Sequence, residues 1–525
     1  MKIVASAALA AAFLVGGSIA AYATDRGGVM TYGRYADSLF LDPVLNDANV
    51  DIWILSNIYD TLLLPTDDGQ GVQPGLATEW KVSDDGLSVT LKLRDGIKFS
   101  DGSPIEASDV IWSLKRAATP DFGIWGFLVS AIKDVTSGAD GSIVITLSRA
   151  DPSIIPALTV FNTAIMPQKL FEAMPGKTDA EKAKAFAEHP IGSGPFMFAS
   201  WERGSSMKLV KNPYYWALGD DGKPLPYLDG VTFEVIPDDA TRILRMQSGE
   251  LDGAEFIPYA RVAELKTSDA INMELYPSTR IEYVTLNTRP QIEGKDNPLS
   301  NLKVRQALNY ATNKDAIIQI VTQGVGTPMK SFMSSATPLN SGTGALFPYD
   351  LDKAKALLAE AGFKDGFSID LLVLAGNQDE TGIGTALQQM WAAAGVKLNL
   401  KQVDNATRTD LYRSGKFTMR LGAWTDDIAD PSEITSYFAY SPTIQSQHSG
   451  WKSDEVDKLF ETSQSERDPA KRTAEYARIQ EIANAEGPMV YLYETPYPVA
   501  LSKKVKGFIQ IPLGNNIFRA ASLTK

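Results

Sequence analysis

Residues 368–400 read SIDLLVLAGNQDETGIGTALQQMWAAAGVKLNL, and this stretch decides the fold. Ser368 to Leu374 is a nearly continuous apolar run, which is typical of a buried strand, whereas Val396 to Leu400 alternates apolar and polar residues. Between them, Thr385 to Ala394 is predicted to be helical, with Gly395 at its end. A strand, a helix and a strand within about 35 residues form the βαβ unit of a parallel or mixed sheet. The second half is therefore predicted to be an α/β lobe.

Two more helices are predicted in this half. Ser300 is expected to cap a helix that carries Val304, Leu308 and Ala311, and Asp350 is expected to cap another that Gly362 closes. The first half has a different pattern, in which predicted hairpins alternate with predicted helices. Its predicted elements are a strand at Val29–Tyr35, a helix at Asn49–Leu63, a hairpin or meander at Leu87–Ile105, a helix at Ser108–Ala118, a strand through Ile143, Ile145 and Leu147, an exposed helix at Asp179–Glu188 and a strand at Phe196–Phe198.

Composition restricts the possible functions. The 525 residues are 44% hydrophobic and 22% charged, which predicts a globular protein of two or three domains. The 50 Lys and Arg residues are outnumbered by 63 Asp and Glu residues, which argues against a nucleic-acid partner. The absence of cysteine excludes disulfides, a cysteine nucleophile and thiolate metal sites.

The N-terminus predicts export. Lys2, an apolar run from Ile3 to Ile19 and the small residues Ala21-Tyr22-Ala23 describe a signal peptide of residues 1–23, cleaved after Ala23. The alternative is an N-terminal membrane anchor, which the short apolar run disfavours. We therefore expect a periplasmic protein.

Two short β-rich runs are predicted to cross between lobes, Tyr283–Thr288 and Met489–Tyr493, and together they would form a hinge. The last 30 or so residues would then complete the sheet of the first lobe. Between Ile191 and Phe196 lies a Gly-Ser-Gly turn, for which phosphate binding is the tempting interpretation. No helix follows these glycines, so that interpretation has little support.

The stretch from Gly422 to Ser432 is predicted to be a recognition loop, because it places Trp424 beside three carboxylates. Asp427 is the candidate contact for a cationic ligand group, with a helix cap or a solvated charge as the alternative. Asp426 and Asp430 are expected to be capping and solvent residues. Trp424 and Trp125 are candidates either for pocket lining or for the core. The spacing of a calcium loop is missing, and no metal or cofactor is expected.

An enzyme has little support in the sequence. The two histidines, His189 and His448, have no identifiable partner pattern for a Ser-His-Asp hydrolase or a zinc enzyme. A periplasmic hydrolase acting on peptides or conjugates stays the rival of another class, because it would turn its ligand over instead of capturing it.

Several motifs occur in an order that resembles one family. They are Tyr59-Asp60-Thr61-Leu62-Leu63, Leu76-Ala77-Thr78-Glu79-Trp80, Asp84-Asp85-Gly86, Leu93 to Gly102, Ala107-Ser108-Asp109-Val110, Ile191 to Phe196, Lys211 to Trp216, Val304 to Ala311 and Ala354 to Gly362. On these motifs the chain resembles the family 5 extracellular solute-binding proteins, the oligopeptide- and dipeptide-binding class of ABC importers.

The resemblance implies an α/β, two-lobed periplasmic binding protein of the cluster C type, with mixed sheets and a subdomain inserted in lobe I. Lobe I would comprise residues 24–54, 186–282 and 491–525, the inserted subdomain 55–185, and lobe II 283–490. It would act as a monomer that captures a peptide or peptide-like ligand between its lobes and delivers it to the permease subunits. Nickel or haem carriage is known elsewhere in the family, and no residue pattern here supports it.

The resemblance also implies site residues. In the peptide binders the position of Asp427 pairs with the ligand's α-ammonium, and that of Trp424 lines the pocket. Dipeptide binders place an arginine after the strand that corresponds to Ser368–Leu374, whereas this chain has Gly376-Asn377-Gln378. Because the amides of Asn377 and Gln378 suit hydroxyls and amides better than a carboxylate, longer peptides or opine-like sugar and amino-acid conjugates become alternatives to a dipeptide. Arg34, beside Tyr32, is a further candidate, as a replacement cation.

Overall fold

The computed structural model describes residues 25–46, 48–120, 122–123, 125–342 and 347–524. The predicted signal peptide at residues 1–23 lies outside them. Within the described part, no helix combines the length and the apolar character that crossing a membrane requires.

The first lobe is built on a seven-stranded sheet whose strands come from distant parts of the chain. In spatial order they are β12 (Ile271–Tyr276), β21 (Tyr497–Ser502), β11 (Gly253–Ala254), β1 (Val29–Arg34), β10 (Gly230–Val235), β9 (Ser206–Lys211) and β8 (Phe196–Glu202). Strand β21 pairs antiparallel with both β12 and β11. The prediction that the C-terminal residues complete this sheet is therefore confirmed.

A four-stranded antiparallel sheet belongs to the same half of the chain. Its order is β4 (Ala77–Val82), β5 (Ser88–Leu93), β7 (Ile143–Leu147) and β6 (Ile132–Ser137). The alternation read from the sequence is confirmed, because Val89, Leu91, Ile143 and Ile145 are fully buried on one face. Helix α2 (Ala107–Ala117) contributes Val110 and Leu114 to the same core, as its apolar spacing predicts.

The second lobe is built on a six-stranded sheet. Its order is β16 (Thr327–Pro328), β20 (Met489–Glu494), β13 (Ile281–Leu286), β19 (Met419–Trp424), β17 (Phe367–Leu374) and β18 (Val396–Val403). Strands β17 and β18 are parallel over their whole length, and α11 (Gln378–Ala393) connects them, so the βαβ prediction is confirmed. The fully buried Trp391 of α11 lies in the core of this lobe.

Helix α11 begins seven residues earlier than the predicted Thr385. The side-chain oxygen of Asn377 accepts a hydrogen bond from the Glu380 amide and caps the helix there. The sequence pattern did not predict this first part of the helix, because it contains Gly382 and Gly384. A β-carbon on Gly384 would lie 2.8 Å from the side chain of Leu400, so this glycine permits close packing of the helix on β18.

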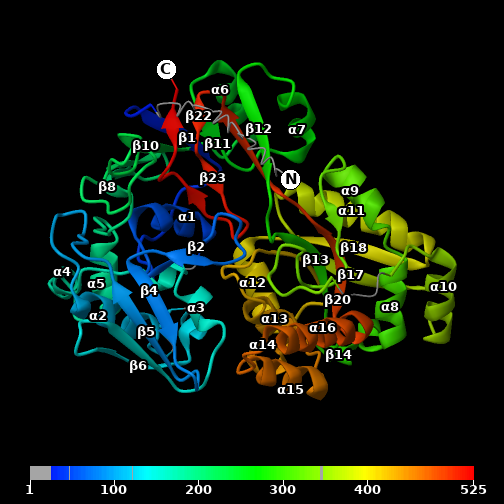
Figure 1. The fold of residues 1–525 in the computed structure, drawn as a ribbon. Helices are drawn as coiled ribbons and strands as arrows, with labels where there is room; N and C mark the ends of the chain where they lie inside the picture. The colour runs from blue at the N-terminus through cyan, green and yellow to red at the C-terminus, as the bar shows by residue number, and fades with distance from the viewer. Residues whose placement is uncertain (1–24, 47, 121, 124, 343–346, 525) are drawn as a thin grey trace, which may run out of the picture.

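The two lobes exchange the chain at 277–280 and at 495–496, between β12 and β13 and between β20 and β21 (Figure 1). The predicted crossings at Tyr283–Thr288 and Met489–Tyr493 are displaced, because most of each run is paired inside the six-stranded sheet as β13 and β20. Both connections leave the same end of that antiparallel pair. The exact lobe boundaries stay a prediction.

Other boundaries differ by a few residues. Helix α1 (Asn49–Ile58) ends before the predicted Leu63. Helix α8 (Leu302–Tyr310) is capped by Asn301 and not by Ser300, which ends a short 3-10 turn. Helix α5 (Asp179–Phe186) is only partly exposed, since its Ala183 and Phe186 are fully buried. The Asp350 cap of α10 (Leu351–Glu360) is confirmed.

The remaining elements complete the two lobes. The helices are α3 (Ile154–Ala157), α4 (Gln168–Glu172), α6 (Asp239–Ser248), α7 (Tyr259–Leu265), α9 (Lys314–Val321), α12 (Asn405–Arg413), α13 (Ser432–Phe438), α14 (Ser441–His448), α15 (Asp454–Ser463) and α16 (Pro469–Glu486), with 3-10 turns η1 (Gly126–Val129), η2 (Phe161–Thr163) and η3 (Pro298–Ser300). The two-stranded ribbons pair β2 (Leu63–Pro65) with β3 (Val72–Pro74), β14 (Gln291–Ile292) with β15 (Lys295–Asp296), β22 (Val505–Lys506) with β25 (Ser522–Leu523), and β23 (Ile509–Gln510) with β24 (Asn516–Ile517).

The Gly-Ser-Gly turn has a packing role. A β-carbon on Gly192 would lie 2.2 Å from the carbonyl oxygen of Ile58, and the amide of Gly194 donates a hydrogen bond to that same oxygen at 2.8 Å. The turn thus holds the end of α1, which accounts for both glycines without a bound phosphate. We expect Gly192→Ala to lower the free energy of unfolding by about 1–3 kcal/mol, because the added methyl group overpacks this contact.

Thermal unfolding followed by circular dichroism would measure the effect of Gly192→Ala as a lower Tm. Gly71→Ala is the matched control, since a β-carbon there would meet only Thr66, at 3.6 Å. Equal Tm values for the two variants would contradict the packing role of Gly192.

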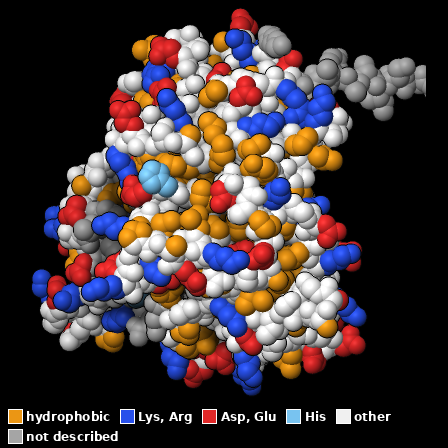
Figure 2. Space-filling view, turned by 90° about the vertical axis from the view of Figure 1, so that its left-hand side faces the viewer, with side chains coloured by type: hydrophobic (Ala, Val, Ile, Leu, Met, Phe, Trp, Pro, Cys, Tyr) orange, Lys and Arg blue, Asp and Glu red, His pale blue; other side chains and the backbone are white. Residues whose placement is uncertain are grey.

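The surface of the first lobe carries mixed charge. On the face shown in Figure 2, Lys and Arg side chains are interspersed with Asp and Glu and do not gather into one basic surface. This agrees with the acidic composition, and the absence of a nucleic-acid partner stays a prediction.

Candidate functional site

The recognition loop lies between β19 and α13. Strand β19 pairs with β13, which places Trp424 opposite Ile281 at the end of the ladder. The half-buried Trp424 ring packs on Tyr437 and Phe438, with ring centroids 4.7 and 5.7 Å apart, and its Nε1 donates a hydrogen bond to Asp426. Trp424 thus supports the loop from the core of the second lobe and keeps part of its surface exposed.

Asp426 and Asp430 are both buried, which corrects the expectation of solvent residues. Asp426 is fully buried; its carboxylate accepts a hydrogen bond from Thr337 at 2.7 Å, and its amide donates to Thr279. Burial raises the pKa of Asp426 to about 7. Asp430 accepts a hydrogen bond from the Ser432 amide at the start of α13, but the N-cap position of this helix is Pro431, so Asp430 is not its cap residue.

A buried ion pair fixes the end of the loop. Arg472 of α16 binds Asp430 in a bidentate manner, with nitrogen–oxygen distances of 2.5 and 2.8 Å, and both side chains are almost fully buried. Such forked pairs specify geometry as well as charge. With Arg472 bound to Asp430, the loop carboxylate of Asp427, three residues earlier, has no cationic partner among the described residues.

Asp427 instead faces a second acid, Glu433, in the first turn of α13. One carboxylate oxygen of Glu433 accepts hydrogen bonds from the amides of Asp427 and Ile428, at 2.8 and 3.2 Å. Burial, with the charge of nearby Asp426, raises the pKa of Asp427 to about 7. Burial and the two neighbouring aspartates raise the pKa of Glu433 well above its ordinary value. No lysine or arginine in the described part of the chain pairs with either acid.

The loop touches the first lobe as well as the second. The hydroxyl of Tyr497, on β21, donates to the Thr425 hydroxyl at 3.1 Å. Ile428 is buried in an apolar cluster with residues of the first half of the chain, namely Ile52, Trp53, Leu128, Val160 and Phe161. The Asp427–Glu433 pair is therefore held between the two lobes.

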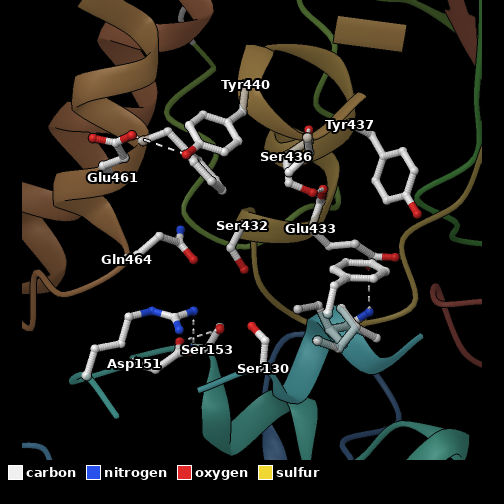
Figure 3. Close-up of a pocket in the computed structure, with 16 residues that line it drawn as sticks. Ser130, Asp151, Ser153, Ser432, Glu433, Ser436, Tyr437, Tyr440, Glu461 and Gln464 are labelled. Atoms are coloured by element: carbon white, nitrogen blue, oxygen red, sulfur yellow. Dashed lines mark hydrogen bonds and ion pairs between the residues drawn. The ribbon is translucent and has the colours of Figure 1, made fainter. Parts of the chain in front are cut away.

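A cavity of about 560 Å³ adjoins this pair (Figure 3). One wall comes from residues 127–153, between η1 and the start of α3, and the other from α13, α14, α15 and the residues next to them. Glu433, Tyr437 and Ile428 line it, and Asp427 does not; we call it the cavity behind Asp427 because Ile428 and Glu433 separate the two. Its size lies in the range of small-molecule sites.

The other predicted site residues lie at different places. Trp125 is half-buried, packs edge-on against Phe161 and donates to the Asn46 carbonyl; Phe127, two residues on, lines the cavity instead. Tyr32 is fully buried among aromatic rings. Arg34 is also buried, 3.4 Å from Glu255, and donates to the Val50 carbonyl, so its charge is already matched in this conformation. The ligand-binding roles of these residues stay predictions.

Asn377 and Gln378 line a separate open cavity of about 610 Å³ beside the start of α11. Asn377 uses its side-chain oxygen as the helix cap, whereas Gln378 is exposed. The structure does not bring either residue into the cavity behind Asp427, and their part in binding stays a prediction.

Sequence reasoning missed Glu433. A signal was present, because Asp430 and Glu433 are spaced as an N-cap residue and the acid three positions later in a capping box. In the structure Glu433 does turn back, but toward the amides of Asp427 and Ile428 in the loop.

The family model described as "Bacterial extracellular solute-binding proteins, family 5 Middle" matches residues 71–446. The chain belongs to this family. Family 5 proteins bind solutes for transport and work in the periplasm or outside the cell. The predicted membership and the two-lobed α/β fold are thus confirmed.

Relatives within family 5 match nearly the whole chain. Heme-binding protein A of Haemophilus influenzae is 28% identical, covering 89% of this chain and 87% of that protein. The probable D,D-dipeptide-binding periplasmic protein of Escherichia coli is 27% identical, covering 95% and 94%. The structure of the Helicobacter pylori periplasmic binding protein DppA with the peptide STSA has a TM-score of 0.81 and 26% identity, covering 95% and 99%.

Proposed function

We propose that this family 5 protein is the periplasmic ligand-binding component of an ABC importer, and that it captures a peptide or peptide-like molecule by its amino group. The observation that carries the proposal is the Asp427–Glu433 pair, which lies between the lobes with no lysine or arginine of the described chain bound to it. An ammonium group of the ligand supplies the missing cation. The closed, loaded form is then presented to the permease.

The electrostatics favour enclosure of the ligand. An ion pair at 4 Å is worth about 4 kcal/mol at an effective dielectric of 20. Micromolar affinity needs about 8 kcal/mol, so the remainder comes from contacts made when both lobes close on the ligand. The contacts of Thr425 and Ile428 with the first lobe are the kind of closing contact that this requires.

The alternatives differ in what they require. An opine-like conjugate is not favoured, because relatives at 26–28% identity are named for peptides, whereas the solved neighbours that hold opines are 24% identical. The heme of the Haemophilus relative is named for that protein, and no cluster of possible metal ligands occurs in the described part of this chain. A hydrolase would release products from the peptide, which mass spectrometry of an incubated mixture detects.

Calorimetry with the tetrapeptide Ser-Thr-Ser-Ala and its N-acetylated form tests the proposal. The free peptide is expected to bind at least ~30-fold more tightly, since acetylation removes the ammonium that pairs with Asp427. Comparable affinities for the two peptides, or cleavage of the free one, would refute this function.

The same titration should depend on pH. The carboxyl of Asp427 faces Asp426, Glu433, Tyr437 and Tyr497, and its raised pKa of about 7 means that it is mostly protonated at pH 6. A peptide amine, with a pKa of about 7.7–8.0, is still mostly cationic at pH 7.5, so affinity should rise about 5-fold from pH 6 to pH 7.5 as Asp427 ionises. Buffers of different ionisation enthalpy would reveal the proton that binding releases. A flat profile would contradict an anionic partner with this pKa.

A further inference from the structure

The cavity behind Asp427 is lined by more charged, aromatic and hydroxyl side chains than the binding of a single ammonium group requires. Four charged side chains line it: Arg149, Asp151, Glu433 and Glu461. Arg149 lies 3.5 Å from Asp151, whose other oxygen accepts two hydrogen bonds from Ser153. The charges of Arg149 and Asp151 therefore offset each other, and Glu433 and Glu461 have no cationic partner in the cavity.

Glu433 points to a ligand independently of this charge count. Its side chain is almost fully buried, yet its Oε1 accepts no hydrogen bond from any described residue. The other oxygen is used by the loop amides. A buried oxygen without a partner is costly, and the residue that carries it lines the cavity.

Aromatic rings form the rest of the walls. Phe127 and Tyr437 meet edge to face across the two walls, with ring centroids 5.6 Å apart. Tyr440 packs on Phe460, and its hydroxyl donates to Glu461 at 3.1 Å. Figure 3 shows Glu461 and Tyr440 on one side of the cavity and Glu433 and Tyr437 on another, with several serine hydroxyls and Gln464 in the same view. Aromatic faces beside carboxylates attract organic cations.

We propose that this cavity is a second subsite, which takes a basic side chain of the ligand, of the lysyl or arginyl type. The proposal rests on the proposed function, because it extends the ligand from its amino group at Asp427 into the adjoining cavity. Glu461 offsets the charge of the basic group, the Oε1 of Glu433 accepts one of its N–H groups, Tyr437 and Tyr440 cover its apolar stem, and the hydroxyls accept its remaining N–H groups. The protein thereby selects basic peptides over neutral peptides of the same length.

Calorimetry with matched tripeptides tests this preference. Ala-Lys-Ala and Ala-Arg-Ala should bind at least about 10-fold more tightly than Ala-Met-Ala, whose side chain is similar in length but uncharged, because a partly desolvated cation gains both charge and ring contacts. Ala-Glu-Ala should bind more weakly than Ala-Met-Ala. Equal affinities for the lysyl and methionyl peptides would overturn the subsite and leave the amino-group site standing, whereas failure of every tripeptide to bind would overturn both.

A variant at the cavity rim separates the subsite from the loop. In Glu461→Gln the ratio of the Ala-Lys-Ala and Ala-Met-Ala affinities should fall below about 3, since the side chain keeps its size and loses its charge. Glu455→Gln is the control: it lies on the same helix, is exposed, and pairs with Arg478 outside the cavity. Its ratio should equal that of the unmodified protein. An unchanged ratio in Glu461→Gln, or an equal fall in both variants, would contradict the subsite.

Discussion

Asp427→Ala is expected to weaken the binding of a free-amino peptide by at least ~30-fold, roughly 2 kcal/mol, while the protein stays folded. The reason is that Asp427 is the loop carboxylate left for a ligand cation, since Asp430 is paired with Arg472 and Asp426 is bonded to Thr337 and Trp424. Isothermal titration calorimetry with Ser-Thr-Ser-Ala measures the loss. Asp365→Ala, at an exposed turn before β17, is the matched control.

The stability of the ligand-free protein should fall as pH rises, whereas its affinity for the peptide rises. Because the pKa of Asp427 is raised to about 7 in the folded protein, the carboxyl favours folding in its protonated form, and this contribution is lost as pH rises from about 4 through 7. Asp427→Asn removes the buried charge, so its Tm at pH 8 should exceed that of the unmodified protein by at least about 1 °C. A mutant that binds the peptide normally, or that is less stable at pH 8, would contradict the role assigned to Asp427.

Arg472→Ala is expected to destabilise the protein by about 3–5 kcal/mol, because it leaves Asp430 buried without its cation. The same change frees the end of the loop that holds Asp427, so peptide affinity should also fall. Thermal unfolding and calorimetry on the same sample measure the two effects. Arg478→Ala, on the same helix as Arg472 and with only exposed ion pairs among the described residues, should change neither by more than about 0.5 kcal/mol.

A double replacement distinguishes a missing cation from a missing side chain. Arg472→Met with Asp430→Asn removes both charges and keeps most of the volume, so it should regain a large part of the lost stability. Peptide affinity should recover less, because the forked geometry that orients the loop is gone. A double variant no more stable than Arg472→Ala would contradict this explanation, because it keeps most of the volume and has no buried aspartate charge left without its cation.

Much of the fold could be predicted because the buried strands have local patterns. The apolar run at 368–374 and the alternation at 143–147 identify β17 and β7 without knowledge of the rest of the chain. The start of α11 could not be predicted, because Gly384 is used for packing on Leu400 of β18, a contact that appears only once the helix lies on the sheet. The place where the chain changes lobes also depends on pairing between β13 and β20, strands some 200 residues apart.

The site was less predictable for the same reason. Three aspartates of one loop are equivalent in sequence, but Asp426 is buried by Thr337 and Thr279, and Asp430 by Arg472. None of these partners lies within 40 residues of the aspartate that it bonds. Asn377 was predicted to bind the ligand because of its position after a strand, whereas in the structure its side-chain oxygen caps α11.

The place of β21 in the seven-stranded sheet has a consequence for biogenesis. Residues 497–502 fill the gap between β11 and β12, so a chain that emerges from its N-terminus lacks one inner strand of the first lobe until its last thirty residues appear. The second lobe, whose strands all precede residue 495, can assemble earlier. Nascent or C-terminally truncated chains therefore expose the unpaired edges of β11 and β12, where a chaperone or a protease would first distinguish an unfinished molecule from a complete one.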